Sequence, residues 1–173
     1  LYFEFAEKAR KRVPIRADID YGFDNQMMLK DELRLEPDSV NICGPNSVLD
    51  TIAFVYTKKR HFKNLHQTIE TKVGLRKVHD QVSYDHHQVH LTIPVEQYTE
   101  GELEKDIVVE HMPDSMILKT FPRSVSITYL VGLSKYERVI PELFKATVDY
   151  RQVEKGEEYL NVQIKQAPDY LKS

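Results

Sequence analysis

The 173-residue sequence contains no tryptophan and a single cysteine, Cys43. One cysteine excludes an intrachain disulfide and a cysteine-rich zinc site. No apolar run approaches the roughly 20 residues that a membrane-spanning helix requires. Alanine is also scarce, with 6 residues against 37 valines, isoleucines and threonines. Because β-branched side chains suit a pleated sheet and alanine suits helices, this composition favours strands.

The sequence also lacks a large excess of charge of either sign. It has 24 Lys+Arg against 27 Asp+Glu, and its formal net charge is −3. A protein that coats nucleic acid needs a clear excess of basic residues, so we expect no nucleic-acid partner. Hydrophobic residues make up 41% of the chain and charged residues 29%, which is typical of a folded protein rather than a disordered one.

Both ends of the sequence read as parts of a longer chain. Residue 1 is leucine, and residues 1–5 alternate like a strand already in progress. Residues 167–173 form a turn that leads toward a further element. We therefore expect residues 1–12 to be the end of a preceding repeat or a connecting strand, and the C-terminal domain to be incomplete.

Short sequence matches indicate an internal repeat. Val13-Pro14-Ile15 is similar to residues 93–95, and residues 37–42 are similar to residues 122–127. The offset between later matches grows along the chain, as loop insertions between equivalent strands would make it grow. We therefore predict a mostly-β chain of two small, twisted tandem domains with short helices. The predicted domains are residues 13–92 and 93–173, joined by a shared or continuous strand over residues 89–95.

Alternating apolar residues and turn signals predict the strands of each domain. In the first domain, Gly44-Pro45 follows a strand, and Asn46 or Ser47 is expected to cap a short helix with Val48, Leu49 and Ile52 on its inner face. Further strands are predicted over residues 53–57, 67–75, 82–93, 144–150 and 159–165.

Six of the seven histidines fall between His61 and His90. On a continuous strand His86 and His90 would share one face, which makes them the candidate metal ligands. Asp80 and Asp85 are the nearest carboxylates, and zinc needs three or four converging ligands. Because the spacing fits no established zinc pattern, a solvated polar strand face is the favoured interpretation. We expect no bound metal and no other cofactor.

Two basic segments occur, at residues 8–12 and 58–63. Lys58, Lys59 and Arg60 are the candidate contacts for an anion or an acidic partner. The alternative for both segments is a charged sheet edge or loop that prevents edge-to-edge pairing. The acidic overall balance and the lack of aromatic residues interleaved with the basic ones favour this alternative.

The sequence contains no motif of a catalytic centre. Nothing similar to Gly-x-Ser-x-Gly occurs. Residues 44–47 have neither the glycine spacing nor the Lys-Ser/Thr ending of a phosphate-binding loop. We therefore predict that the chain is not an enzyme. Cys43 is expected to be a small buried core residue, because isolated cysteines are commonly buried.

The segment from Leu35 to Ile52 resembles the YbbR-like domain family, in which Pro-x-Ser-Val-x-Val-x-Gly-Pro precedes a short helix and a strand. Val13-Pro14-Ile15 is similar to the interdomain strand of that family, and residues 121–127 resemble the same element in a second copy. There, residues 129–132 (Tyr-Leu-Val-Gly) replace Gly-Pro, so a different turn is expected. The resemblance covers about residues 11–171.

This resemblance implies a tandem array on the extracytoplasmic face of the cell membrane, behind an N-terminal transmembrane helix, and it supplies no catalytic residues. In one branch of the family the protein regulates a membrane diadenylate cyclase. We therefore expect a non-enzymatic interaction or regulatory module of a membrane-anchored protein, whose partner is another protein such as a membrane enzyme. Exposed strand edges at the domain junctions are the expected contacts.

The alternative is a ligand-binding module. It would use the histidine-rich strand for a metal, or the basic loop at Lys58 for an anion.

Overall fold

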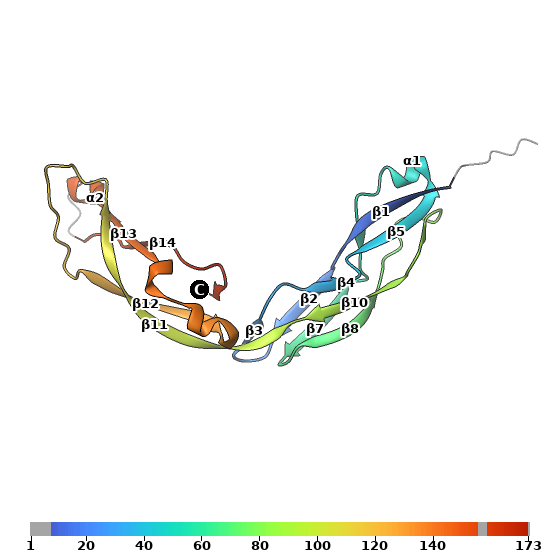
Figure 1. Ribbon diagram of the computed structural model, residues 1–173, viewed down its shortest axis with the longest axis horizontal. Helices are drawn as coiled ribbons and strands as arrows, with labels where there is room; N and C mark the ends of the chain where they lie inside the picture. Colours follow the sequence, from blue (N-terminus) through green and yellow to red (C-terminus); the bar gives the residue numbers. More distant parts are fainter. Residues whose placement is uncertain (1–7, 156–158, 173) are drawn as a thin grey trace, which may run out of the picture. The chain divides into compact units, whose positions relative to one another are not determined.

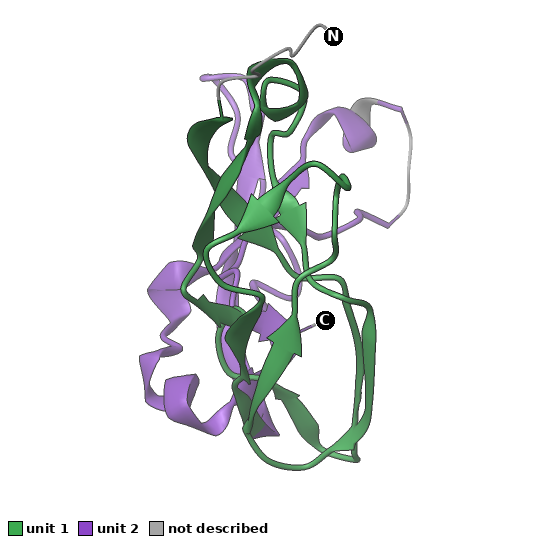
Figure 2. Ribbon diagram, turned by 90° about the vertical axis from the view of Figure 1, so that its right-hand side faces the viewer, with its two compact units in different colours: residues 1–96 green, residues 97–173 purple. Residues whose placement is uncertain are grey.

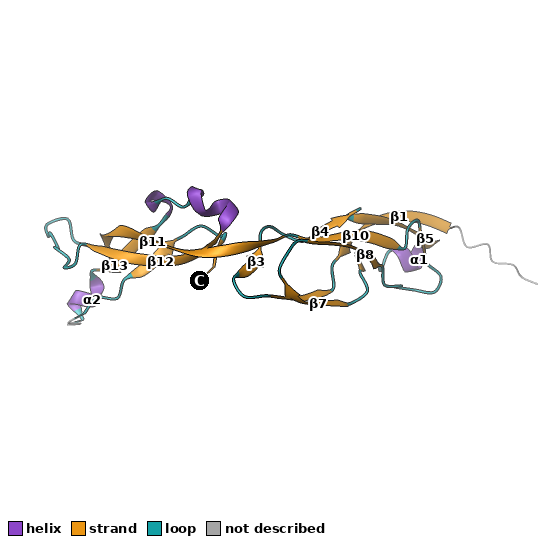
Figure 3. Ribbon diagram, turned by 90° about the horizontal axis from the view of Figure 1, so that it is seen from below, coloured by secondary structure: helices purple, strands orange, loops and turns teal. Residues whose placement is uncertain are grey.

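The computed structural model describes residues 8–155 and 159–172. The expected strand over residues 1–5 lies outside these described residues. Strands dominate, with a few short helical segments, as the composition predicts (Figure 3). The chain divides into two compact units, residues 1–96 (unit 1) and residues 97–173 (unit 2), coloured green and purple in Figure 2. None of the helices in the described part of the chain is long and apolar enough to cross a membrane.

The main sheet of unit 1 is built around β1 (Lys8–Arg16). Strand β1 pairs antiparallel with β5 (Ser39–Pro45), as Figure 1 shows. It also pairs parallel with β6 (Val55–Tyr56). Strand β9 (Ser83–Tyr84) pairs with the other side of β5, which gives the order β6-β1-β5-β9. This sheet carries the first basic segment and Cys43.

Five further strands form two smaller groups, and β3 pairs with β11. Strands β4, β10 and β8 make an antiparallel sheet in that order, and β2 pairs parallel with β7. The predicted strand over residues 82–93 is interrupted at residues 85–87, so it forms β9 and β10 instead of one strand. The bounds are β2 (Ile19–Phe23), β3 (Met27–Leu29), β4 (Arg34–Glu36), β7 (Arg60–Leu65), β8 (Ile69–Gly74) and β10 (Gln88–Ile93).

The core of unit 1 follows from alternation along its strands. Side chains on a strand point to opposite faces in turn, so Val13 and Ile15 of β1 pack inward together with Val40 and Ile42 of β5. Apolar residues of the smaller sheets complete one continuous cluster. Its buried members are Val13, Ile15, Val40, Ile42, Leu49, Ile52, Val55, Leu65, Val73, Leu75, Val82, Val89, Leu91, Ile93 and Val95.

The predicted short helix is present as α1 (Asn46–Leu49), and Leu49 and Ile52 are buried as expected. The expected cap is wrong, because Pro45 holds the N-cap position and no side chain caps the helix there. The other end is stabilised instead. The Lys11 ammonium donates to the carbonyl oxygens of Leu49 and Ile52 at 3.0 and 2.8 Å.

Unit 2 contains a sheet in the order β14-β13-β11-β12-β15. Its long strand β11 pairs antiparallel with β12 and parallel with β13. The bounds are β11 (Val95–Glu110), β12 (Ser124–Gly132), β13 (Lys145–Asp149), β14 (Gln163–Gln166) and β15 (Leu171–Lys172). Two 3₁₀ segments, η1 (Leu133–Arg138) and η2 (Pro141–Leu143), and the short helix α2 (Arg151–Glu154) lie between these strands.

The two units share one pairing pattern. In each, a first strand pairs antiparallel with a second and parallel with a third, and a helical turn follows the second strand. Pro14 pairs with Ser39, and Asp106 pairs with Ser124. The register therefore aligns residues 13–15 with residues 105–107 and not, as the sequence match indicated, with residues 93–95.

The two compact units meet in the chain after Glu96, and the sequence predicted a domain boundary between residues 92 and 93. Both positions lie near Pro94. This proline is the one residue between β10 and β11. That the two units are copies of one family domain stays a prediction.

Candidate functional site

The two candidate metal ligands lie on different kinds of backbone. His90 is part of β10, where it pairs with Glu36 of β4 and Lys72 of β8. His86 lies in the loop between β9 and β10. The expectation that both histidines share one strand face is therefore wrong, because the strand begins only at Gln88.

The contacts of His86 are those of a local structural link. Its Nδ1 lies 2.6 Å from Oδ1 of Asp85, and its Nε2 is buried with no hydrogen-bond partner in the described part of the chain. Asp85 also accepts a hydrogen bond of 2.7 Å from the Asn41 side-chain amide. Burial alone would raise the pKa of Asp85, but the hydrogen bonds from Asn41 and the charge of His86 outweigh it and lower that pKa.

Within residues 8–155 and 159–172, no three His, Cys, Asp or Glu side chains are grouped as metal ligands would be. The structure thus adds no converging ligand to either histidine. A metal site at His86 or His90 stays the alternative that the sequence left open beside the expectation of no bound metal.

The basic segment at Lys58, Lys59 and Arg60 lies beside Asp20 of β2. Lys59 Nζ is 3.2 Å from Oδ2 of Asp20, and His61 Nδ1 is 3.1 Å from the same oxygen. Lys58 and Arg60 are exposed, and their side chains have no ion pair with any described residue. Of the three candidate anion contacts, Lys59 is therefore already paired with an aspartate, whereas Lys58 and Arg60 are not paired with a described carboxylate. The anion-binding alternative stays a prediction.

Aromatic rings and arginines interleave next to this loop. The Arg16 guanidinium lies 3.9 Å from the ring centre of Phe54, and Phe54 meets Tyr56 edge to face at 5.1 Å. Arg76 lies 5.5 Å from the Tyr56 ring centre and forms an ion pair with Asp18. The sequence shows no such interleaving, because these residues belong to separate segments. Arg16, the last residue of β1, is attracted to the Phe54 ring, so these contacts stabilise the C-terminal end of β1.

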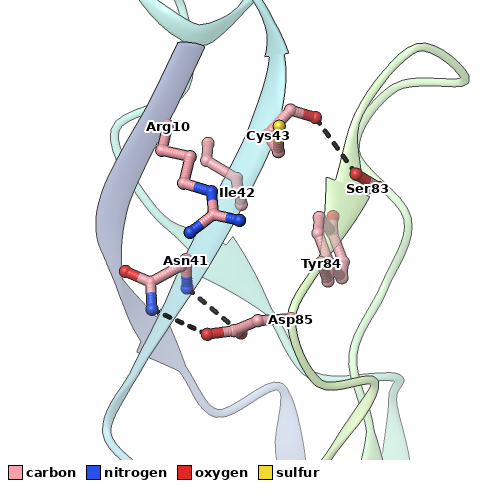
Figure 4. A pocket seen from close by; sticks show the side chains of 7 residues that line it. All are labelled: Arg10, Asn41, Ile42, Cys43, Ser83, Tyr84 and Asp85. Carbon is pink, nitrogen blue, oxygen red and sulfur yellow. Dashed lines mark hydrogen bonds between the residues drawn. The ribbon is translucent and has the colours of Figure 1, made fainter. Parts of the chain in front are cut away.

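The outward face of the β1–β5–β9 sheet is hollowed into a depression of about 260 Å³ (Figure 4). Arg10 extends across β5 toward Asn41, whose side chain and backbone N–H both bond Asp85. No described carboxylate pairs with Arg10, although Asp85 lines the same depression. The lining residues are Arg10, Asn41, Ile42, Cys43, Ser83, Tyr84 and Asp85.

Cys43 lies in this outward face and is half-buried. The expectation that it is a buried core residue is wrong. Val40 and Ile42 are the inward residues of β5, so alternation turns Asn41 and Cys43 toward the other face. Cys43 stands opposite Arg10 in the ladder with β1.

A second cavity, of about 370 Å³, lies in unit 2. Ile107, Val125 and Val148, from three neighbouring strands, contribute to its wall. The segment between β11 and β12 and the segment before β14 complete it with exposed apolar side chains. Phe121 is 102% exposed and Tyr159 is 83% exposed. The full lining is Ile107, Leu118, Lys119, Thr120, Phe121, Pro122, Val125, Val148, Tyr159, Leu160 and Val162.

Sequence reasoning missed this unit 2 cavity. Its signal was a run of apolar residues, Met116-Ile117-Leu118, in a segment without strand alternation. Ile117 in this run is 87% exposed. Tyr159 lines the same cavity as Leu118, but it lies far from Leu118 in the sequence, so local sequence patterns could not show that the two residues meet.

A charged cluster joins three strands of unit 2. Glu110 at the end of β11 pairs with Lys145 of β13 at 2.9 Å and with Lys165 of β14. Hydrogen bonds from Lys165 and then Lys145 lower the pKa of Glu110 to about 2. Next to it, hydrogen bonds from Arg151 lower the pKa of Asp149. These carboxylates are neutralised by their neighbours, which is the role of a structural cluster and not of an acid–base pair.

No family model matches the sequence, and no curated protein or solved structure is significantly similar to it. The relationship to YbbR-like domains therefore stays a prediction that rests on the sequence motifs.

Proposed function

We propose that this chain is a non-enzymatic protein-binding module of a membrane-anchored YbbR-like protein, and that it acts on the extracytoplasmic face of the membrane. The observation that carries the proposal is the apolar surface around the unit 2 cavity. Phe121 and Tyr159, which line this cavity, expose most of their side chains to water. Exposed apolar groups gathered over a cavity are typical of protein interaction sites.

The physical argument is the cost of leaving these side chains in water. Burying apolar surface is favourable by roughly 25 cal/mol per Å². Buried aromatic side chains supply much of the binding energy at protein interfaces. Apart from Lys119, Thr120 and the Tyr159 hydroxyl, the described side chains of the cavity lining are apolar, so an aliphatic or aromatic side chain of a partner fits this site.

The class of partner comes from the family resemblance. YbbR-like proteins face the outer surface of a membrane, and one branch regulates a membrane diadenylate cyclase. We therefore propose a membrane protein as the partner, with such a cyclase as the first candidate. The binding of this partner regulates it without any catalytic step by this chain.

The test places a photocrosslinking residue, p-benzoylphenylalanine, at position 121 of the full-length parent protein in its own cells. Glu137, an exposed polar residue in η1, is the matched control position in the same unit. We expect position 121 to crosslink to one membrane protein, which mass spectrometry identifies, and position 137 to give no such adduct. The Phe121→Ser variant should reduce copurification of that protein.

Equal adducts at positions 121 and 137, or none at position 121, would contradict the proposal. If the partner is a cyclase, cyclic dinucleotide synthesis in isolated membranes should also change with Phe121→Ser. A matched Glu137→Gln variant should leave that synthesis unchanged.

A further inference from the structure

The outward face of β1 carries a regular row of cations. Along this strand Val13 and Ile15 point into the core, so the residues that alternate with them face solvent. Lys8, Arg10 and Arg12 occupy successive outward positions, roughly 6.6–6.8 Å apart. We refer to these three residues as the β1 stripe. Lys11 does not belong to it, because its ammonium donates to carbonyl oxygens after β5.

The β1 stripe carries charge that the rest of unit 1 does not neutralise. Arg12 Nε donates to the hydroxyl oxygen of Ser39 at 2.8 Å, which is a neutral partner. Lys8 and Arg10 have no carboxylate partner among the described residues. Asp85, which lines the same depression as Arg10, is instead held by Asn41 and His86. Three like charges at this spacing favour an anionic partner.

The backbone of this part of β1 is also open on one side. Strand β5 pairs with residues 8–14, whereas β6 reaches only Ile15 and Arg16. In the described part of the chain, no other strand pairs with residues 8–12. The N–H and C=O groups that point away from β5 therefore form an open edge, which can accept another strand.

We propose that residues 8–12 form a docking edge for an extended acidic segment of another polypeptide. This segment pairs with the open side of β1 and places carboxylates at alternate positions beside Lys8, Arg10 and Arg12. The period of side chains on one face of an extended peptide equals that of the β1 stripe, so the charges match in register.

A polypeptide fits both features of this edge. An anionic lipid surface or a nucleic acid would supply negative charge but no amide donors for a sheet ladder. A second copy of β1 would bring the same positive charges to the edge, and directly opposed like charges are unfavourable. The β1 stripe thus disfavours basic strands and favours an acidic one. This surface is separate from the unit 2 cavity, so either proposal can fail alone.

The test measures binding of fluorescent peptides to the whole chain by anisotropy at low salt. One peptide alternates glutamate and threonine. The comparison peptide has the same length and glutamate content but repeats Glu-Glu-Thr-Thr, so that half of its carboxylates point to each face of an extended strand. The variant Arg10→Gln/Arg12→Gln is compared with Lys63→Gln/Lys72→Gln, which removes the same charge from exposed positions on β7 and β8.

We expect the alternating peptide to bind more tightly than the comparison peptide. Its affinity should fall about three- to tenfold in Arg10→Gln/Arg12→Gln, since exposed ion pairs are individually weak, and should change less than about twofold in the control. Binding should weaken as salt rises. Unchanged thermal midpoints would show that both variants fold.

Equal binding of the two peptides, or equal losses in the two variants, would overturn the proposal by showing a response to net charge alone. Vesicles of phosphatidylglycerol and phosphatidylcholine and a single-stranded oligothymidylate serve as competing probes. The proposal would also be overturned if either probe, and not the alternating peptide, required Arg10 and Arg12.

Discussion

At the scale of single residues, the direction of a side chain matters as much as its charge. Lys11 belongs to a basic run, yet it lies on the inward-facing side of β1 and is half-buried. Its neighbours Arg10 and Arg12 face solvent. The Lys11 ammonium thus serves the fold by donating to the carbonyl oxygen of Leu49, the last residue of α1, and to that of Ile52 just after it.

We predict that Lys11→Met destabilises the chain by about 1–3 kcal/mol, because it removes two hydrogen bonds donated by a charged group and takes from the Ile52 carbonyl its charged donor. Urea unfolding followed by circular dichroism measures this loss. Lys63→Met, at an exposed position on β7, is the control and should change stability by less than about 0.5 kcal/mol. Equal effects of the two changes would show that the Leu49 and Ile52 carbonyl contacts contribute nothing.

Close approach of two backbone segments explains why residue 44 is a glycine. A Cβ at Gly44 would lie 2.9 Å from the carbonyl oxygen of Gln81, which is a backbone atom and cannot move aside cheaply. In unit 2 the pairing register places Tyr129 at the equivalent position, and β12 continues to Gly132 before η1 begins. The loss of the Gly-Pro pair there thus accompanies a longer strand.

At the scale of elements, the cluster at Glu110 connects β11, β13 and β14. Glu110 and Asp149 are paired residues on parallel strands, so their like charges would repel without the surrounding cations. Lys145, Lys165 and Arg151 neutralise them. The short strand β14 exposes all its side chains, so these ion pairs help to hold it in place.

We predict a pH dependence from this cluster. The pKa of Glu110 is lowered from 4.5 to about 2, so the stabilisation it provides is fully present above pH 4.5 and is lost as pH falls through about 2. Unfolding midpoints in urea should decline over this window, and they should decline less in Glu110→Gln. A nuclear magnetic resonance titration of the Glu110 carboxyl carbon should give a midpoint near 2.

A midpoint near 4.5 in that titration would contradict the ion pairs with Lys145 and Lys165. Asp20→Asn is the control for the stability series. It removes an exposed aspartate of unit 1 that pairs with Lys59, and we expect it to leave the low-pH decline unchanged.

At the scale of the whole molecule, the two units differ in their cores. The continuous buried cluster belongs to unit 1. In the described part of unit 2, the buried hydrophobic residues are Val131, Phe144, Ala146 and Val148. A smaller core buries less apolar surface and supplies less of the free energy that offsets chain entropy.

We therefore predict that unit 2 opens before unit 1. Hydrogen exchange followed by mass spectrometry should show faster exchange in β12 and β13 than in β5 and β10. Leu91→Ala should cost unit 1 about 2–5 kcal/mol, and Val131→Ala should cost unit 2 about 1–3 kcal/mol. Each change should shift the exchange of its own unit. A single cooperative opening, shifted equally by both, would contradict this prediction.

Local patterns in the sequence determined the strand-rich character and the short helix with Leu49 and Ile52 on its inner face. These features depend on side-chain shape and on neighbours a few residues away, because alternation and turn residues act locally. The same patterns also identified Lys58, Lys59 and Arg60 as a charged surface segment.

Only the tertiary structure decided which of these residues meet. It moved His86 off the strand of His90, turned Cys43 outward, gave Lys59 an aspartate partner and assembled the unit 2 cavity from Phe121 and Tyr159. It also left one side of residues 8–12 open. The physical reason is that strand pairing joins residues far apart in sequence, and its register is fixed by the packing of the whole unit.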